Sequence, residues 1–154
     1  MKPTVPPVFA EKDLNYYLRM IRGDFGETEE EGQMAKSVSA AKQKNIVLVL
    51  NSQGLGQGKP ELSQRLMKFF IQALVHNRVK PRALILLNEA VYLAAEGSPL
   101  INDLDVLVQQ GVRVMVDVIS ADEYKVEQNL KVGCIADMDN ICDFLLTAWK
   151  VISL

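Results

Sequence analysis

Short apolar runs that alternate with amphipathic stretches constrain the fold of this chain more than any other feature. NIVLVL at 45–50 and ALILL at 83–87 are nearly all apolar, as strands covered on both faces are. VRVMVDV at 112–118 predicts a third strand, and VISL at 151–154 predicts a last one. Strands that alternate with helices form right-handed β–α–β units. The sequence therefore predicts an α/β fold, with a mainly parallel sheet and helices on both faces.

Three helices are predicted between these strands, because apolar residues recur there every three or four positions. The first begins at Pro60, since proline suits the first helical position, and its stripe is Leu62, Leu66, Phe69, Phe70, Ala73 and Leu74. The second is expected to be capped by Ser98, to begin at Pro99 and to end at Gly111, with the stripe Leu100, Leu104, Leu107 and Val108. The third carries Ile141, Phe144, Leu145 and Ala148. We expect these stripes and Trp149 to lie in the core.

The chain is predicted to divide into an N-terminal helix with an acidic linker at 1–44 and the α/β domain at 45–154. Apolar residues at helical spacing mark the N-terminal helix: Leu14, Tyr17, Leu18 and Ile21. Four acids at 27–31 are typical of a solvated linker. We expect the apolar face of this helix to pack on the α/β domain or on another subunit.

Charge and hydropathy exclude several classes of function. Seventeen basic residues against nineteen acidic ones give a net charge of −2, so no basic field attracts a phosphate backbone, and we predict no nucleic acid binding. The apolar runs are far shorter than the roughly 20 residues that span a bilayer, so we predict no membrane association. The first 13 residues hold three prolines and two acids, unlike a signal peptide. We therefore expect a cytoplasmic protein.

The chain has too few cysteines and histidines for a disulfide framework or a structural zinc site. Its two cysteines are Cys134 and Cys142, and its one histidine is His76. We predict no metal and no cofactor. Cys142 lies in an apolar helical pattern and is expected to be buried, while His76 near a helix end makes histidine-dependent hydrolysis improbable. The basic residues after it are expected to be solvated: Arg78, Lys80 and Arg82.

Ligands of open parallel sheets bind beyond the carboxyl ends of the strands. Residues 51–58, 88–97 and 117–122 directly follow the first three predicted strands and begin with polar residues. The candidate ligand-binding residues in the first two segments are Asn51, Ser52, Gln53, Gly54, Gly56, Gly58, Asn88 and Glu89. The same residues are equally suited to cap strands and helices.

The glycine-rich loop at 54–58 does not match either common nucleotide motif. A phosphate loop needs glycine where Gln53 stands and a hydroxyl where Pro60 stands, and a dinucleotide fingerprint needs glycine at Lys59 or Glu61. What remains is a flexible loop before a helix, whose amides can hold a small anion. The carboxylate of Glu61 opposes that binding.

Three segments of the chain resemble one known family: IVLVLNSQGLGQGKPELSQRLMKFFIQAL, ALILLNEAVYLAAEGSP and KVGCIADMDNICDFLLTAWKVISL. Over residues 45–154 the sequence is similar to the DsrE/DsrF-like sulfur-relay family, most closely to the C-terminal domain of YedF-type proteins of selenium metabolism. The resemblance implies an α/β domain and a homo-oligomer. In competent members it also implies a sulfurtransferase-like activity, in which a cysteine carries persulfide sulfur to a relay partner.

The family-site equivalents in this chain carry no thiol. YedF-like relatives have a CGTC-like pattern after the third strand, where this chain has Asp117 and Ser120, followed by Asp122 and Tyr124. A serine hydroxyl has a pKa far above that of a thiol and does not hold transferable sulfur. The first 44 residues contain no cysteine either, so the Cys-Pro-x-Pro motif of an upstream TusA-like domain is missing.

These departures leave three functional hypotheses. We expect a non-catalytic, oligomeric binding or scaffold protein that is related to sulfur or selenium relay proteins. The second hypothesis is a persulfide carrier that uses Cys134, although nearby Asp137 and Asp139 would raise the thiol pKa and reduce its reactivity. The third is a small-molecule or anion sensor that uses the strand-end loops.

Overall fold

The computed structural model describes residues 43–154. The helix and most of the acidic linker predicted for 1–44 lie outside these residues. The first strand begins at Gln43, two residues before the predicted boundary of the α/β domain.

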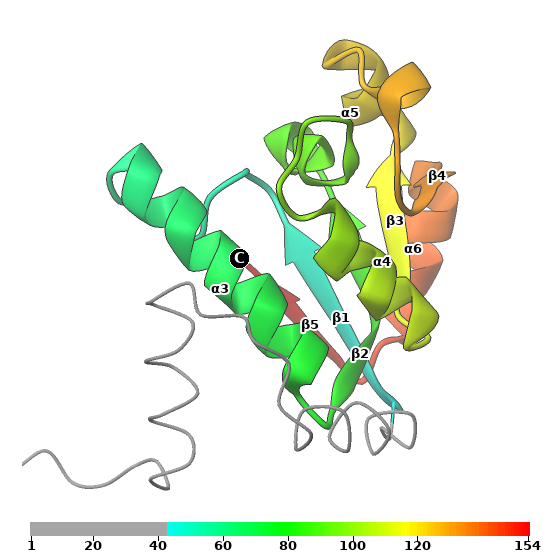
Figure 1. Cartoon of the computed structure of the whole chain (residues 1–154). Coiled ribbons are helices and arrows are strands. Elements are labelled where there is room, and N and C mark those ends of the chain that lie inside the picture. Colours follow the sequence, from blue (N-terminus) through cyan, green and yellow to red (C-terminus); the bar gives the residue numbers. More distant parts are fainter. Residues whose placement is uncertain (1–42) are drawn as a thin grey trace, which may run out of the picture. The chain divides into compact units, whose positions relative to one another are not determined.

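Five parallel strands form one sheet in the order β4-β3-β2-β1-β5 (Figure 1). The strands are β1 (Gln43–Leu50), β2 (Lys80–Leu86), β3 (Arg113–Asp117), β4 (Cys134–Ala136) and β5 (Lys150–Ser153). The predicted parallel α/β sheet is confirmed. The short strand β4 adds an edge next to β3, in register from Met115 opposite Cys134 to Asp117 opposite Ala136.

The central strands are nearly all apolar because helices cover both faces of the sheet. Along β1, Leu48 and Leu50 enter one core while Val47 and Val49 enter the other, as the alternation of side chains along a strand requires. On the first face lie α3 (Pro60–His76), the 3₁₀ helix η1 (Asn88–Ala94) and α4 (Ile101–Gln109) (Figure 1). On the second face lies α6 (Met138–Thr147). The short helices α5 (Val118–Glu123) and η2 (Glu127–Asn129) follow β3.

The predicted start of α4 is wrong by two residues. The hydroxyl of Ser98 accepts a hydrogen bond from Leu100 N (3.1 Å), so Ser98 and Pro99 form a turn and the helix begins at Ile101. Pro60 as the first residue of α3 and Gly111 just after α4 are confirmed, and Gly111 has the positive φ of 90° that its place after a helix requires.

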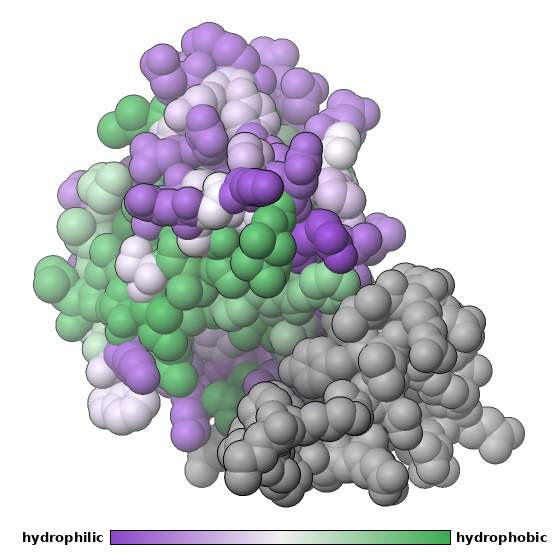
Figure 2. All heavy atoms as spheres, turned by 90° about the vertical axis from the view of Figure 1, so that its left-hand side faces the viewer, coloured by the Kyte–Doolittle hydropathy of each residue, from purple (hydrophilic) through white to green (hydrophobic). Residues whose placement is uncertain are grey.

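Several residues predicted to lie in the core are exposed. The row of α3 that faces the sheet is Ser63, Met67 and Ile71, which turns Leu62 and Leu66 outward, with 50% and 43% of their surface exposed. Figure 2, which faces this side of the molecule, shows a broad apolar area there. Three further core predictions are wrong because their side chains lie outside the helix–sheet contacts: Val108, Cys142 and Trp149.

Lys80 is fully buried, although its basic neighbours led us to expect a solvated side chain. It opens β2 under the end of α3, and its Nζ donates to Leu74 O (2.5 Å) and Val75 O (2.6 Å). The last carbonyls of a helix need donors from outside the helix, which explains the position of this amine. Burial lowers the pKa of Lys80 to about 8.

Candidate functional site

The carboxyl ends of the three central strands lie side by side, as the sheet order requires. Leu87 N donates to Leu50 O (2.9 Å), which joins the end of β2 to the end of β1. On the other side, Asn51 Nδ2 donates to Ser153 Oγ (3.1 Å), and Asn51 N donates to Leu154 O (3.3 Å). Asn51 therefore closes the gap between β1 and β5 and does not stand free in a crevice.

Asp117, Ser120 and Asn88 form a closed hydrogen-bonded group at the ends of β3 and β2. Ser120 Oγ donates to Asp117 Oδ2 (2.6 Å) and accepts from Asn88 N (2.9 Å). Asp117 Oδ2 also accepts from Ser120 N (2.9 Å), so the carboxylate caps α5. Asp117 and Ser120 are 4% and 8% exposed, and Asn88 adopts a left-handed φ of 50°. We call this group the Asp117 cluster; it ties η1 to α5.

The second carboxylate oxygen of the Asp117 cluster, Oδ1, is buried and has no hydrogen-bond partner among the described residues. Leaving a buried acceptor without a donor costs folding free energy. The hydrogen bonds to Asp117 Oδ2 therefore hold the carboxylate in place, and Oδ1 does not contribute. None of these groups is a thiol, and no basic side chain enters the cluster through the hydrogen bonds found. The arrangement can hold a backbone turn in place, and it offers no nucleophile for sulfur.

The remaining family-site equivalents lie outside the Asp117 cluster. Asp122 is exposed and pairs with Lys125 at 3.2 Å. Tyr124 packs edge-on against Tyr92, with 5.3 Å between the ring centroids. Glu89 is exposed on η1.

The glycine loop packs against the first turn of α3. Leu55 N donates to Ser63 O (2.9 Å), and Ser52 Oγ donates to Gly54 O (2.5 Å). A Cβ at Gly54 would meet Ser63 Cβ at 2.6 Å, so only glycine allows this close approach. Gly56 has a positive φ of 76°, and Gly58 lies near the Ser63 hydroxyl. Packing and turn geometry thus account for these glycines.

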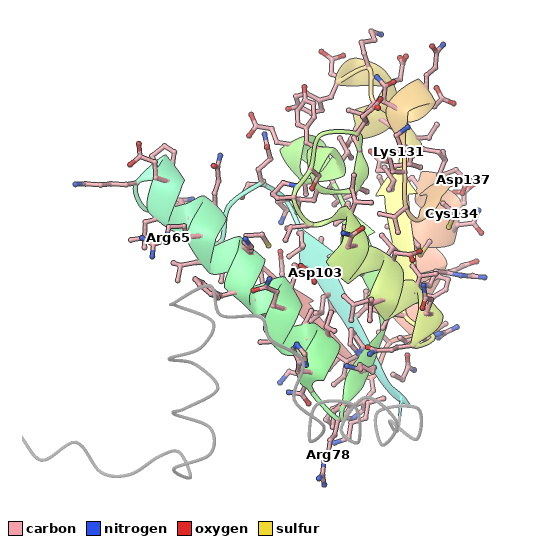
Figure 3. All side chains as sticks on the ribbon, viewed as in Figure 1. Arg65, Arg78, Asp103, Lys131, Cys134 and Asp137 are labelled. Atoms are coloured by element: carbon pink, nitrogen blue, oxygen red, sulfur yellow. The ribbon has the colours of Figure 1, made fainter. Side chains whose placement is uncertain are left out.

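Cys134 lies at the edge of the sheet, opposite Met115 in the neighbouring strand, and takes no part in the hydrogen bonds of the Asp117 cluster. It begins β4, its side chain is exposed, and its Sγ lies 3.5 Å from Val114 O as a weak donor. Figure 3 shows it across the molecule from α3. Asp137 caps α6 by accepting from Asn140 N (2.8 Å). The contact of Cys134 is thus with a backbone carbonyl, and within residues 43–154 it forms no ion pair with a basic side chain.

An open cleft of about 740 Å³ lies between the first half of α3 and residues 92–100. Of the predicted ligand-binding residues only Gln53 lines it, although Tyr92, Leu93, Glu96 and Gly97 in its lining belong to the predicted segment 88–97. The α3 wall of the cleft was not predicted. The available signal was a polar stripe on the otherwise apolar helix α3: Glu61, Gln64, Arg65 and Lys68, at positions i, i+3, i+4 and i+7. In the opposite wall, Ser98 and Pro99 form a turn, whereas the sequence pattern predicts a helix cap at Ser98 and the first helical residue at Pro99.

Asp103 lies just beyond this cleft, where α4 faces α3 (Figure 3). Burial raises the pKa of Asp103, while a hydrogen bond from Gln72 and the charges of Lys68 and His76 oppose that rise. The polar stripe of α3 thus continues from the cleft into the contact between the two helices.

The described residues contain no group of three or more side chains that could hold a metal ion. In the same part of the chain, no helix is long and apolar enough to cross a membrane.

Comparison with known proteins supports the fold and goes no further. No family model and no curated protein matches the sequence. Among solved structures, the crystal structure of the YchN protein from E. coli is similar, with a TM-score of 0.52 and 22% sequence identity. The match covers 73% of this chain and 100% of that chain. This similarity shows that the two chains share a fold.

Proposed function

We propose that this chain is a non-catalytic binding or scaffold protein that uses a DsrE-like fold without carrying sulfur on a cysteine. One observation carries the proposal. At the end of β3, where the family resemblance implies a sulfur-carrying thiol, the Asp117 cluster has the buried hydroxyl of Ser120, which donates a hydrogen bond to the Asp117 carboxylate. Such a group neither forms a persulfide nor releases one.

The position of Cys134 supports the same proposal. A persulfide carrier works as a thiolate, which a nearby cation or a helix N-terminus stabilises. Cys134 instead begins an edge strand and donates weakly to a backbone carbonyl, and no hydrogen bond or ion pair joins it to a cationic side chain among the described residues.

The exposed apolar surface supports an oligomer or a protein partner, such as a relay protein. Exposed or half-buried apolar residues lie on α3 and in or directly after β5: Leu62, Leu66, Phe70, Ile152 and Leu154. We call this the α3–β5 surface; it lies on the side of the molecule shown in Figure 2. Contiguous apolar surface of this kind marks interaction sites on soluble proteins.

Sulfur loading tests the proposal directly. The full chain is incubated with a cysteine desulfurase and cysteine, and intact-mass spectrometry under non-reducing conditions counts added sulfur atoms. We expect no stable gain of sulfur beyond a trace shared equally by Cys134 and Cys142, because both thiols are exposed.

Cys142→Ser and Cys134→Ser form a matched pair for this measurement. Sulfur that loads Cys134 selectively, is lost in Cys134→Ser and is kept in Cys142→Ser would overturn the proposal. It would make the chain a relay protein with a displaced carrier.

A further inference from the structure

The cleft beside α3 has the size and position of a small-molecule site. Its volume of about 740 Å³ falls within the roughly 300–1,000 Å³ of ligand pockets. Gln53, which follows β1, lines one part of the cleft, and the chain that follows β2 through η1 lines another. The cleft therefore lies at the carboxyl ends of two central strands, where open parallel sheets bind ligands.

One wall of the cleft is apolar and firmly held. Leu93 and Leu100 line it and are otherwise buried, with 6% and 2% of their surface exposed, and Pro99 lies between them in the turn. Tyr92 is 36% exposed in the same wall, and its ring is fixed by the edge-on contact with Tyr124. This wall offers an apolar and aromatic surface to the body of a ligand.

The two walls of the cleft differ in charge. Arg65 and Lys68 give the α3 wall two positive charges against one negative charge from Glu61, and none of the three forms an ion pair with a described residue. On the opposite wall the charged residue is Glu96, which is exposed and 3.7 Å from Lys131. A purely anionic ligand would meet Glu96 and Glu61, and a purely cationic one would meet the two bases.

We propose that this cleft binds a small zwitterion with an apolar or aromatic body, of the size of a free aromatic amino acid. Its carboxylate faces Lys68 and Arg65, its ammonium group faces Glu96, and its body lies on Tyr92 and the apolar wall. This proposal deepens the binding function proposed above and rests on it.

Three probes of one shape test the charge pattern. L-Phenylalanine carries both charges, 3-phenylpropanoate lacks the ammonium group, and phenethylamine lacks the carboxylate. Each is titrated into the ¹⁵N-labelled full chain, and amide chemical shifts are followed. We expect saturable shifts for L-phenylalanine at residues 92–100 and in the first half of α3, and binding at least fivefold weaker for the other two probes. No saturable shift with L-phenylalanine, or equal binding of all three probes, overturns the proposal.

Charge variants localise the binding. Lys68→Gln and Glu96→Gln are each expected to weaken L-phenylalanine binding about three- to tenfold, and Tyr92→Leu to weaken it by a similar factor. The matched control is Arg78→Gln, which removes a positive charge just beyond the opposite end of α3 (Figure 3) and is expected to leave binding unchanged. An equal loss in Arg78→Gln would show that net charge governs binding, and the cleft would be the wrong site. Because sulfur loading is measured separately, a failure here leaves the non-catalytic proposal standing.

Discussion

Ser120 has a structural role at the position where the sequence resemblance implies a reactive group. Its hydroxyl links the backbone of Asn88 to the carboxylate of Asp117, so it connects two segments that follow different strands. The position of Asp117 and Ser120 at the end of a strand is predictable, because an apolar run directly precedes them. Their mutual bonds depend on the turn into α5 and on the left-handed Asn88, which no residue pattern specifies.

Ser120→Cys places a thiol in the position that the resemblance implies, and we expect that thiol to be nearly inert. The site is 8% exposed, and the Asp117 carboxylate beside it raises a thiol pKa. Alkylation with iodoacetamide, followed by peptide mass spectrometry, should be at least tenfold slower there than at Cys134 in the same molecule.

Adding Asp117→Asn to Ser120→Cys is the matched control. Asparagine caps a helix as well as aspartate does, so the fold is retained while the charge is removed. Alkylation should then become several-fold faster. A thiol that reacts as fast as Cys134 in the single variant would show that the Asp117 cluster is open to solvent.

Lys80 gives the stability of the protein a specific pH dependence. Its pKa is about 8 in the folded chain, below the ordinary value of 10.5, so the unfolded chain binds more protons between these two values. The free energy of unfolding therefore rises as the pH increases from about 8 to 10.5. Because the amine is fully buried and each pH unit of this interval is worth about 1.4 kcal/mol, we expect a rise of roughly 3 kcal/mol from this group.

Urea unfolding followed by circular dichroism at several pH values across this window tests the role of Lys80. Other groups titrate there too, so the quantity to compare is the difference between the native chain and Lys80→Met, which should grow with pH. Lys125→Met removes an exposed lysine and should keep the native profile. A constant difference for Lys80→Met would show that the amine titrates normally.

At the scale of elements, the strands were predictable and the outer faces of the helices were not. β1 and β2 are covered on both faces, so nearly every side chain had to be apolar. The apolar stripe of α3 is wider than its contact with the sheet, and the pattern does not say which part of a wide stripe faces inward. Leu62 and Leu66 were therefore predicted to be core and lie outside it. Lys80 escaped prediction because lysine is seldom buried unless it is paired.

The cleft was predicted in part. Gln53 and the residues of the segment 88–97 that line it were expected near a ligand, because both segments follow strand ends. Its α3 wall was not expected, because a polar stripe on a helix is equally typical of a solvated face. The turn of Ser98 onto Leu100 N, which places Pro99 and Leu100 before the start of α4, was not predicted either.

For the molecule as a whole, the α3–β5 surface is where the proposed oligomer should form. β5 is an edge strand that pairs with β1 alone, and Leu62, Leu66 and Leu154 near it are 50%, 43% and 36% exposed. A stable interface buries roughly 1,200–2,000 Å² in total, so a charge at its centre is strongly unfavourable. Leu66→Lys should therefore dissociate the oligomer into monomers, or lower its association constant at least tenfold, while the melting temperature changes little.

Sedimentation velocity over a range of protein concentrations tests this prediction. Ile119→Lys is the matched control. Ile119 is 68% exposed on α5, which follows the carboxyl end of β3, and a charge there should leave assembly intact. If Leu66→Lys assembles like the native chain while Ile119→Lys falls apart, the contact lies at the carboxyl end of the sheet, beside the Asp117 cluster. A native chain that stays monomeric at every concentration would remove the oligomer from the proposed function, and the α3–β5 surface would then be a site for a different protein.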